Sequence, residues 1–89
     1  MTSQHAMIRM QQRGIPVGMV DYLLAYGTER HDRCGGVIYH FDKSSRRRLE
    51  RALGRTMVRK LKPFLSIYAV CRTDDTLVTV GHRHKRIYN

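Results

Sequence analysis

The segment HAMIRMQQRGIP, which runs from His5 to Pro16, predicts an amphipathic helix with a defined end. At about 100° per residue, its apolar side chains fall on one stripe. Beside that stripe, His5, Arg9 and Arg13 recur every four residues and form a cationic row. Gly14 can adopt the left-handed conformation that ends many helices, and Pro16 cannot continue one. The cationic edge of this helix is either a solvated surface or part of an anion site.

A second helix is expected over residues 16–26, directly after the first. Pro16 suits the first turn of a helix, and Gly27 ends it. Thr2 or Ser3 can cap the first helix, because a short hydroxyl accepts a hydrogen bond from a free first-turn N–H. With only a residue or two between them, the two helices should form a tight pair.

Strand-forming sequence follows the helical pair and returns near the end of the chain. Residues 37–41 and 66–72 are rich in β-branched and aromatic side chains, and residues 76–81 can form the hairpin partner of the second of these strands. The polar residues 28–33 form either an edge strand or a loop. We therefore expect an α+β fold in which the N-terminal helical pair packs on a small antiparallel β-sheet of three or four strands. Residues 1–89 should form one domain.

A basic helical insert is expected at about 44–62, between the strands. Ser44 or Ser45 is the expected cap of its first helix. Gly54 should end that helix, and Thr56 can cap a second, shorter one. A single long helix is the alternative, although an internal glycine would cost it about 1 kcal/mol.

The charge of the chain is strongly positive and unevenly distributed. The 89 residues carry 17 Lys or Arg and 7 Asp or Glu, a formal net charge of +10. Residues 1–42 contain four Arg and four acids, whereas residues 43–89 contain 13 Lys or Arg and three acids. Such a bias favours a polyanionic partner, most often a nucleic acid.

The tract from Lys43 to Lys62 contains nine Lys or Arg and one Glu. Glu50 is expected to pair with Arg46, one helical turn earlier. Planar guanidinium groups can donate two parallel hydrogen bonds to phosphate, so an arginine face suits a nucleic-acid backbone. A solvated helix face is the alternative. The arginines expected on this face are Arg47, Arg48, Arg51 and Arg55.

The segment GHRHKRIY follows the last expected strand. In an extended chain, His82, His84 and Arg86 share one face. Arg83 and Lys85 share the other. Histidine exchanges protons near neutral pH, and Arg or Lys can stabilise charge that develops on a phosphate. A metal-independent RNA-cleaving site needs these groups; a basic tail that keeps the chain soluble is the alternative.

The expected site residues come from both ends of the chain and from the insert. The candidate catalytic groups are His5, His82, Arg83 and Lys85. The candidate nucleic-acid-binding groups are Arg9, Arg13, Arg47, Arg48, Arg51, Arg55 and Arg86. For these groups to act together, the edge of the first helix should face the terminal strand across a shared groove.

No cofactor and no metal site is expected. His82 and His84 lack a third ligand, and the neighbouring cations would repel a metal ion. Cys34 and Cys71 are far apart in the sequence, and we expect reduced thiols in a cytoplasmic protein without a signal peptide. No apolar run approaches the roughly 18 residues of a membrane span, so no membrane partner is expected.

The motif H-x3-R-x3-R-G-I at residues 5–15 and the motif V-G-H-R-x-K-R at residues 80–86 together resemble the bacterial domain-of-unknown-function family 4258. The resemblance covers essentially the whole chain. The family has been grouped with RelE/ParE-like RNase toxin folds, so it implies N-terminal helices on a small antiparallel sheet. The basic insert 43–62 is longer than the compact toxin pattern needs. The resemblance implies site roles for His5, Arg9, Arg13, His82, Arg83, Lys85 and Arg86.

Two hypotheses of function follow. The first is a small RNA-binding protein, in one version a metal-independent endoribonuclease of toxin type, with RNA a better candidate than DNA. The second is a non-catalytic regulatory or interaction module that uses the arginines of the insert to bind nucleic acid or an acidic, antitoxin-like protein. The sequence leaves the oligomeric state open.

Overall fold

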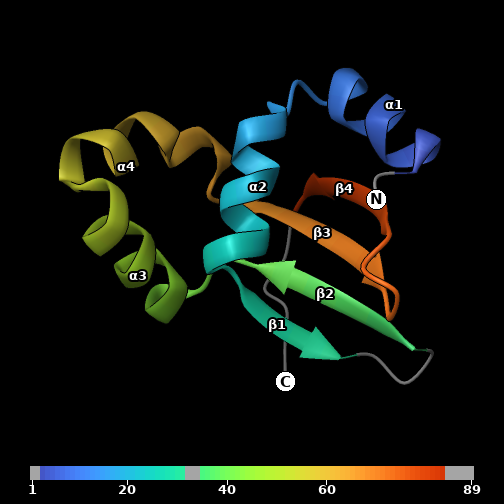
Figure 1. The fold of residues 1–89 in the computed structure, drawn as a ribbon. Coiled ribbons are helices and arrows are strands. Elements are labelled where there is room, and N and C mark those ends of the chain that lie inside the picture. Colours follow the sequence, from blue (N-terminus) through green and yellow to red (C-terminus); the bar gives the residue numbers. More distant parts are fainter. Residues whose placement is uncertain (1–2, 32–34, 84–89) are drawn as a thin grey trace.

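The computed structural model describes residues 3–31 and 35–83 (Figure 1). Two helices, two strands, two further helices with a short 3-10 turn, and two final strands follow one another along the chain. Their bounds are α1 (Gln4–Gln12), α2 (Val17–Tyr26), β1 (Thr28–His31), β2 (Gly36–His40), α3 (Lys43–Leu53), α4 (Arg55–Leu61), η1 (Lys62–Phe64), β3 (Ile67–Arg72) and β4 (Leu77–His82). The predicted α+β fold, with a helical pair on an antiparallel sheet and a basic helical insert, is confirmed.

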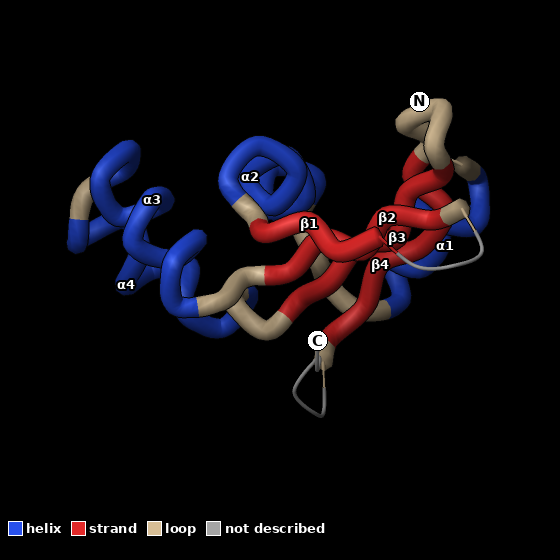
Figure 2. The backbone as a smooth tube through the Cα atoms, turned by 90° about the horizontal axis from the view of Figure 1, so that it is seen from below, coloured by secondary structure: helices blue, strands red, loops and turns tan. Residues whose placement is uncertain are grey.

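The sheet has the strand order β1-β2-β3-β4, and every neighbouring pair is antiparallel. Ile67, Ala69 and Cys71 alternate along β3 onto one face, where all three are buried. Helices α1 and α2 cover this face, α2 against β2 and β3 and α1 against β4 (Figure 2). The helical side of the core consists mainly of Ala6, Met10, Met19, Val20 and Leu23. The opposite face of the sheet carries Ile38, His40, Tyr68, Val70 and Thr79.

Strand β4 contains one extra residue relative to β3. Cys71 faces Leu77, but the preceding Val70 faces Thr79, so Val78 has no partner across the ladder. The bulge leaves the carbonyl oxygens of Leu77 and Val78 available at the outer edge of the sheet. An unpaired edge of this kind is a site for non-specific strand pairing unless something covers it.

Ser3 covers that edge and caps α1 at the same time. Its backbone N–H donates to the Leu77 carbonyl at 2.9 Å, and its hydroxyl donates to the Val78 carbonyl at 3.1 Å. The same hydroxyl accepts a hydrogen bond from the Ala6 N–H at 3.1 Å, as expected for an N-cap. Gly14 has a φ of 62°, which confirms the predicted left-handed end of this helix.

The insert consists of two helices and a 3-10 turn rather than one long helix. The cap of α3 is Asp42, so the prediction of Ser44 or Ser45 in that position is wrong. Asp42 Oδ1 accepts from the Ser45 N–H at 2.8 Å, and Ser45 Oγ accepts from the Asp42 N–H at 2.7 Å. This reciprocal capping box satisfies two free donors at once. Gly54, with a φ of 88°, ends α3, and α4 begins at the next residue, so Thr56 is not a cap.

Cys71 is a free, buried thiol, and burial raises its pKa above the ordinary value for cysteine. Cys34 lies outside the described residues. None of the described helices has the length and apolar character that crossing a bilayer requires.

We predict that Ser3→Ala destabilises the protein by about 1–2 kcal/mol, because it removes both the helix cap and the hydroxyl bond to the edge of β4. Urea denaturation followed by circular dichroism measures this. Ser44→Ala is the matched control, since that exposed hydroxyl accepts a hydrogen bond from the exposed Arg48 side chain and does not join distant parts of the described fold. Equal effects of the two substitutions would contradict the role given to Ser3.

Candidate nucleic-acid interface

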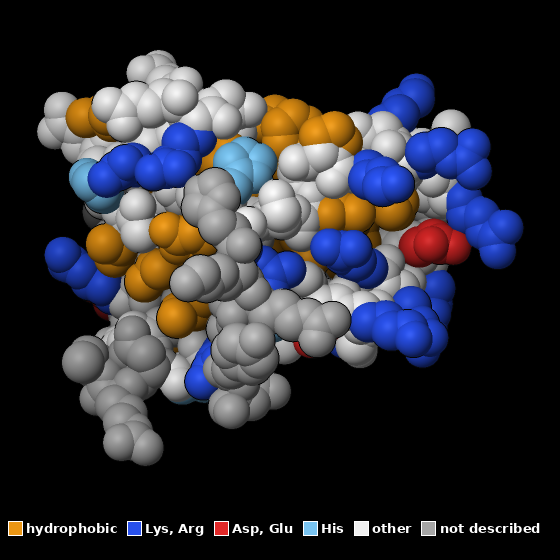
Figure 3. All heavy atoms as spheres, turned by 180° about the vertical axis from the view of Figure 1, so that it is seen from behind, with side chains coloured by type: hydrophobic (Ala, Val, Ile, Leu, Met, Phe, Trp, Pro, Cys, Tyr) orange, Lys and Arg blue, Asp and Glu red, His pale blue; other side chains and the backbone are white. Residues whose placement is uncertain are grey.

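A cleft of about 510 Å³ opens where the end of β2, the first turns of α3 and the residue after β4 meet. Figure 3 shows Lys and Arg side chains gathered over the part of the molecule formed by α3 and α4, with little acidic surface between them. The residues that line the cleft are His40, Phe41, Asp42, Lys43, Arg46, Arg47, Glu50 and Arg83. The capping box of α3 positions this whole group, because it fixes the turn between β2 and the helix.

His40 is the buried imidazole of the cleft. It lies near the end of β2 opposite Tyr68, on the face of the sheet that α1 and α2 do not cover. It is 7% exposed, and its Nδ1 is buried without a hydrogen-bond partner. Burial lowers the pKa of His40 below the ordinary histidine value; Arg83 and Arg30 add to this effect, and Asp42 opposes it. The imidazole is therefore neutral at neutral pH.

Arg83 is the half-buried arginine of the cleft. Its backbone N–H donates to the Ser66 carbonyl at 2.6 Å, and its side-chain Nη2 donates to the Phe41 carbonyl at 2.9 Å. Its Nε is buried and has no acceptor. Burial, together with the neighbouring Arg46, lowers the pKa of Arg83. A guanidinium stays protonated in a protein, so the cleft contains a fixed positive charge with a free donor.

The acidic residues of the cleft are already engaged in local structure. Asp42 caps α3, and its hydrogen bonds with Ser45 are the main reason that its pKa is lowered. Glu50 accepts from Arg55 Nε at 3.2 Å, so the predicted pairing of Glu50 with Arg46 is wrong. Within residues 3–31 and 35–83, the only other salt bridge joins His31 to Glu29. Among the residues that the structure describes, the cleft cations therefore form no salt bridge with a carboxylate.

The predicted arginine face of α3 is divided between two roles. Arg47 lines the cleft, and with Arg51 and Arg55 it also lines a neighbouring hollow of about 360 Å³. Arg48 points back toward the fold instead. Its Nη1 donates to Ser44 Oγ at 3.1 Å and its Nη2 to the Tyr26 carbonyl at 3.2 Å, so it ties α3 to α2.

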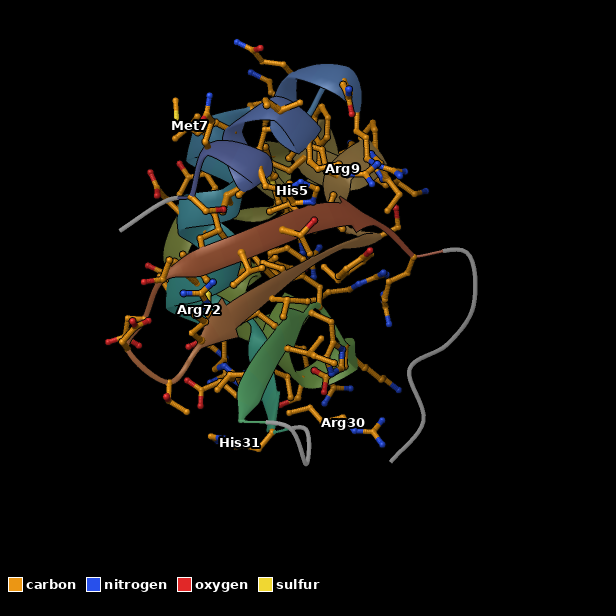
Figure 4. The ribbon with its side chains drawn as sticks, turned by 90° about the vertical axis from the view of Figure 1, so that its right-hand side faces the viewer. His5, Met7, Arg9, Arg30, His31 and Arg72 are labelled. Atoms are coloured by element: carbon orange, nitrogen blue, oxygen red, sulfur yellow. The ribbon has the colours of Figure 1, made fainter. Side chains whose placement is uncertain are left out.

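Helix α1, which carries His5 and Arg9 of the predicted cationic row, packs against β4. The expected groove between this row and residues 82–86 stays a prediction, since residues 84–86 lie outside the described part of the chain. Figure 4 shows His5 and Arg9 projecting from α1 beside β4. His5 and Arg13 are exposed, and Arg9 is half-buried. None of these three residues is part of the cleft lining.

The predicted cluster at the end of the chain separates into different environments. His82 shares the helix-covered face with its partner Ile67, and its Nδ1 lies 3.1 Å from Ser66 Oγ. Arg83 turns to the cleft. Lys85 and Arg86 lie outside the described residues. The structure thus brings Arg83 together with Arg47, and it leaves His5 and His82 outside that group.

Sequence reasoning missed His40, Lys43 and Arg46 as members of the site. A signal for His40 was present, because strict alternation in VIYHF places it on the opposite face from Tyr39, two residues before a helix cap. Among the described residues, no group of three His, Cys, Asp or Glu side chains could hold a metal ion.

The family model described as "Domain of unknown function (DUF4258)" matches residues 2–82. The chain belongs to the DUF4258 family. The DUF4258 match includes both α1 and His82 and ends one residue before Arg83. No curated protein and no solved structure matches the chain. The relationship to RelE/ParE-like toxins stays a prediction.

We predict that acidification destabilises the folded protein through His40. The unfolded chain takes up a proton near the ordinary histidine pKa of about 6.5, whereas the folded chain resists it. The contribution of His40 to stability is therefore complete above about pH 6.5 and is lost as the pH falls through the lowered pKa. Urea unfolding at about pH 7.5 and about pH 5.5 measures the loss.

His40→Leu is the control variant, because it removes the titrating group from a buried position. Its free energy of unfolding should change less over the same interval. If the free energy of unfolding of His40→Leu depended on pH as strongly as that of the wild type, other groups would cause the pH dependence.

Proposed function

We propose that this DUF4258 chain binds the phosphate backbone of RNA or another nucleic acid in the cleft between β2, α3 and Arg83. The observation that carries the proposal is the convergence of Arg46, Arg47 and Arg83 on one cleft, with the Arg83 Nε buried and lacking an acceptor. A phosphate oxygen supplies the missing acceptor and the missing negative charge.

The surface beyond the cleft supports a partner with more than one phosphate. Arg46 and Glu50 also line a hollow of about 420 Å³, which continues along α4 to Arg59 and Lys62. The cleft and this hollow, together with the one that Arg51 lines, surround the same helix. A track of guanidinium groups of this kind gives sequence-tolerant, salt-dependent binding.

The resemblance to RNase toxins is the reason to test RNA first, and an RNA partner agrees with the expected cytoplasmic location. An acidic, antitoxin-like protein is the alternative partner for the same cations. It would compete with RNA, so the effect of arginine substitutions on RNA affinity tests the proposal directly.

We predict that Arg46→Gln/Arg47→Gln weakens binding to single-stranded RNA by about tenfold or more at moderate salt, and that each lost phosphate contact reduces the salt slope by about 0.7. Fluorescence anisotropy over a range of salt concentrations measures both quantities. Arg9→Gln/Arg13→Gln is the matched control: it removes the same charge from α1, outside the cleft. An equal loss in the control would move the interface to α1, and no RNA binding by the wild type would reject the proposal.

Metal-independent RNA cleavage is a second candidate, favoured by the neutral His40 beside Arg83 in the cleft. In such a reaction a base removes the proton of the 2′-hydroxyl, and the 2′-oxygen attacks phosphorus. The bond to the 5′-oxygen breaks, and an acid protonates that leaving oxygen. Arg83 would stabilise the charge on the phosphorane-like transition state. The sequence assigned the proton transfers to His5 or His82, and His40 is a further candidate.

We predict that, if the protein cleaves RNA in the presence of a chelator, His40→Ala lowers the rate by about 10²- to 10⁴-fold. His5→Ala and His82→Ala assign the remaining roles in the same gel assay. If the wild-type protein binds RNA but does not cleave it, the cleavage hypothesis is rejected and the non-catalytic binding module remains. Activity unchanged in all three variants would exclude these histidines.

A further inference from the structure

The cleft contains two buried polar atoms that lack a hydrogen-bond partner, His40 Nδ1 and Arg83 Nε. Among the described residues, these are the two side-chain atoms that are buried without a hydrogen-bond partner. Both residues line the same cleft. Buried polar groups are nearly always paired, so an unpaired one needs an explanation. A single ligand that forms hydrogen bonds with both atoms would explain why neither has a partner in the protein.

The surroundings of these atoms define the charge of that ligand. Arg46, Arg47 and Lys43 line the cleft with Arg83, while Asp42 and Glu50 are engaged with Ser45 and Arg55. An anion is therefore favoured, and a cation is excluded by repulsion. The Phe41 carbonyl holds the other end of the Arg83 guanidinium, so its Nε is fixed in place before any ligand arrives.

We propose that this cleft holds one phosphate group between Arg83 Nε and His40 Nδ1, and that phosphate binding is coupled to the uptake of one proton by His40. The inference rests on the proposed function, since it identifies which part of the nucleic acid enters the cleft and what regulates its binding.

The proton uptake follows from the charges that face His40. The charges of Arg83 and Arg30 disfavour the imidazolium form of His40, and the charge of Asp42 favours it. The other charged residues that line the cleft are Lys43, Arg46, Arg47 and Glu50. Tyr68 faces His40 across the sheet. Burial keeps the imidazole neutral while the cleft has no anion. A phosphate adds negative charge where positive charge predominates, so protonated His40 becomes the better partner and can donate from both nitrogens. Binding should tighten as the pH falls.

The test is an NMR titration of the histidine imidazoles with inorganic phosphate, against sodium chloride of equal ionic strength. We expect phosphate to raise the pKa of His40 by about one unit or more, which corresponds to about tenfold tighter binding to the protonated form. His31, which is exposed on β1 beside Glu29, is the internal control and should not shift. An unchanged pKa of His40 in phosphate would overturn the proposal.

Two variants identify the partner of His40. Arg83→Gln should abolish the shift, whereas Arg72→Gln, at the exposed end of β3 and outside this cleft, should retain it. If circular dichroism shows that Arg83→Gln is unfolded, Arg46→Gln provides the second variant, because this exposed side chain is tied to the described part of the fold by a 3.5 Å hydrogen bond to the Leu65 carbonyl. A full shift in a folded Arg83→Gln, or in Arg46→Gln when Arg83→Gln is unfolded, would overturn the assignment.

RNA oligonucleotides with and without a 5′-phosphate distinguish a terminal phosphate from an internal phosphodiester as the bound group. A His40 shift with either oligonucleotide supports the site. RNA binding that is salt-dependent but independent of pH, without a phosphate effect on His40, would reject this inference and leave the proposed function standing. If phosphate raised the pKa of His40 in a protein that does not bind RNA, this inference would stand and the proposed function would be rejected.

Discussion

The pairing of β3 with its two neighbours is the constraint on which the rest of the structure depends. Side chains alternate between the two faces of a strand, so the register decides which residues enter the core and which enter the cleft. Ile67, Ala69 and Cys71 occupy the helix-covered face, and this puts Tyr68 and its partner His40 on the other. A slip of one residue would exchange these sets. The buried imidazole is therefore a consequence of the same pairing that builds the core.

The arginines around the cleft differ in whether groups of the protein itself hold them. Arg48 and Arg55 are held by groups of the protein itself, a carbonyl of α2 and the carboxylate of Glu50. The guanidinium of the half-buried Arg83 is held through Nη2 by the Phe41 carbonyl, and its buried Nε lacks a hydrogen-bond partner. A buried donor of this kind is unfavourable unless something pairs with it. The proposal of an anion in the cleft rests on this atom.

Local sequence rules predicted the elements well because those elements depend on local chemistry. Gly14, Gly54 and the β-branched run before Cys71 act through their own backbone preferences, and all three were recognised. The cleft depends on contacts between residues 40, 46 and 83, which no local pattern encodes. Alternation in an extended chain placed His82 and Arg83 on opposite faces, but the sequence does not show that the face of Arg83 meets α3.

The bond between Ser3 and the bulge of β4 closes the fold across almost its whole length, since the hydroxyl and its acceptor are 75 residues apart. Contacts of such high sequence separation form late, because the loop between them must be ordered first. During synthesis α1 leaves the ribosome long before β4 exists, so the first helix has no surface on which to pack. Its exposed Met7 and Ile8 accompany a buried stripe that stays open until the last strand is made. The core that α1 shares with Leu77 and Val80 of β4 is therefore complete only after the last strand has been made.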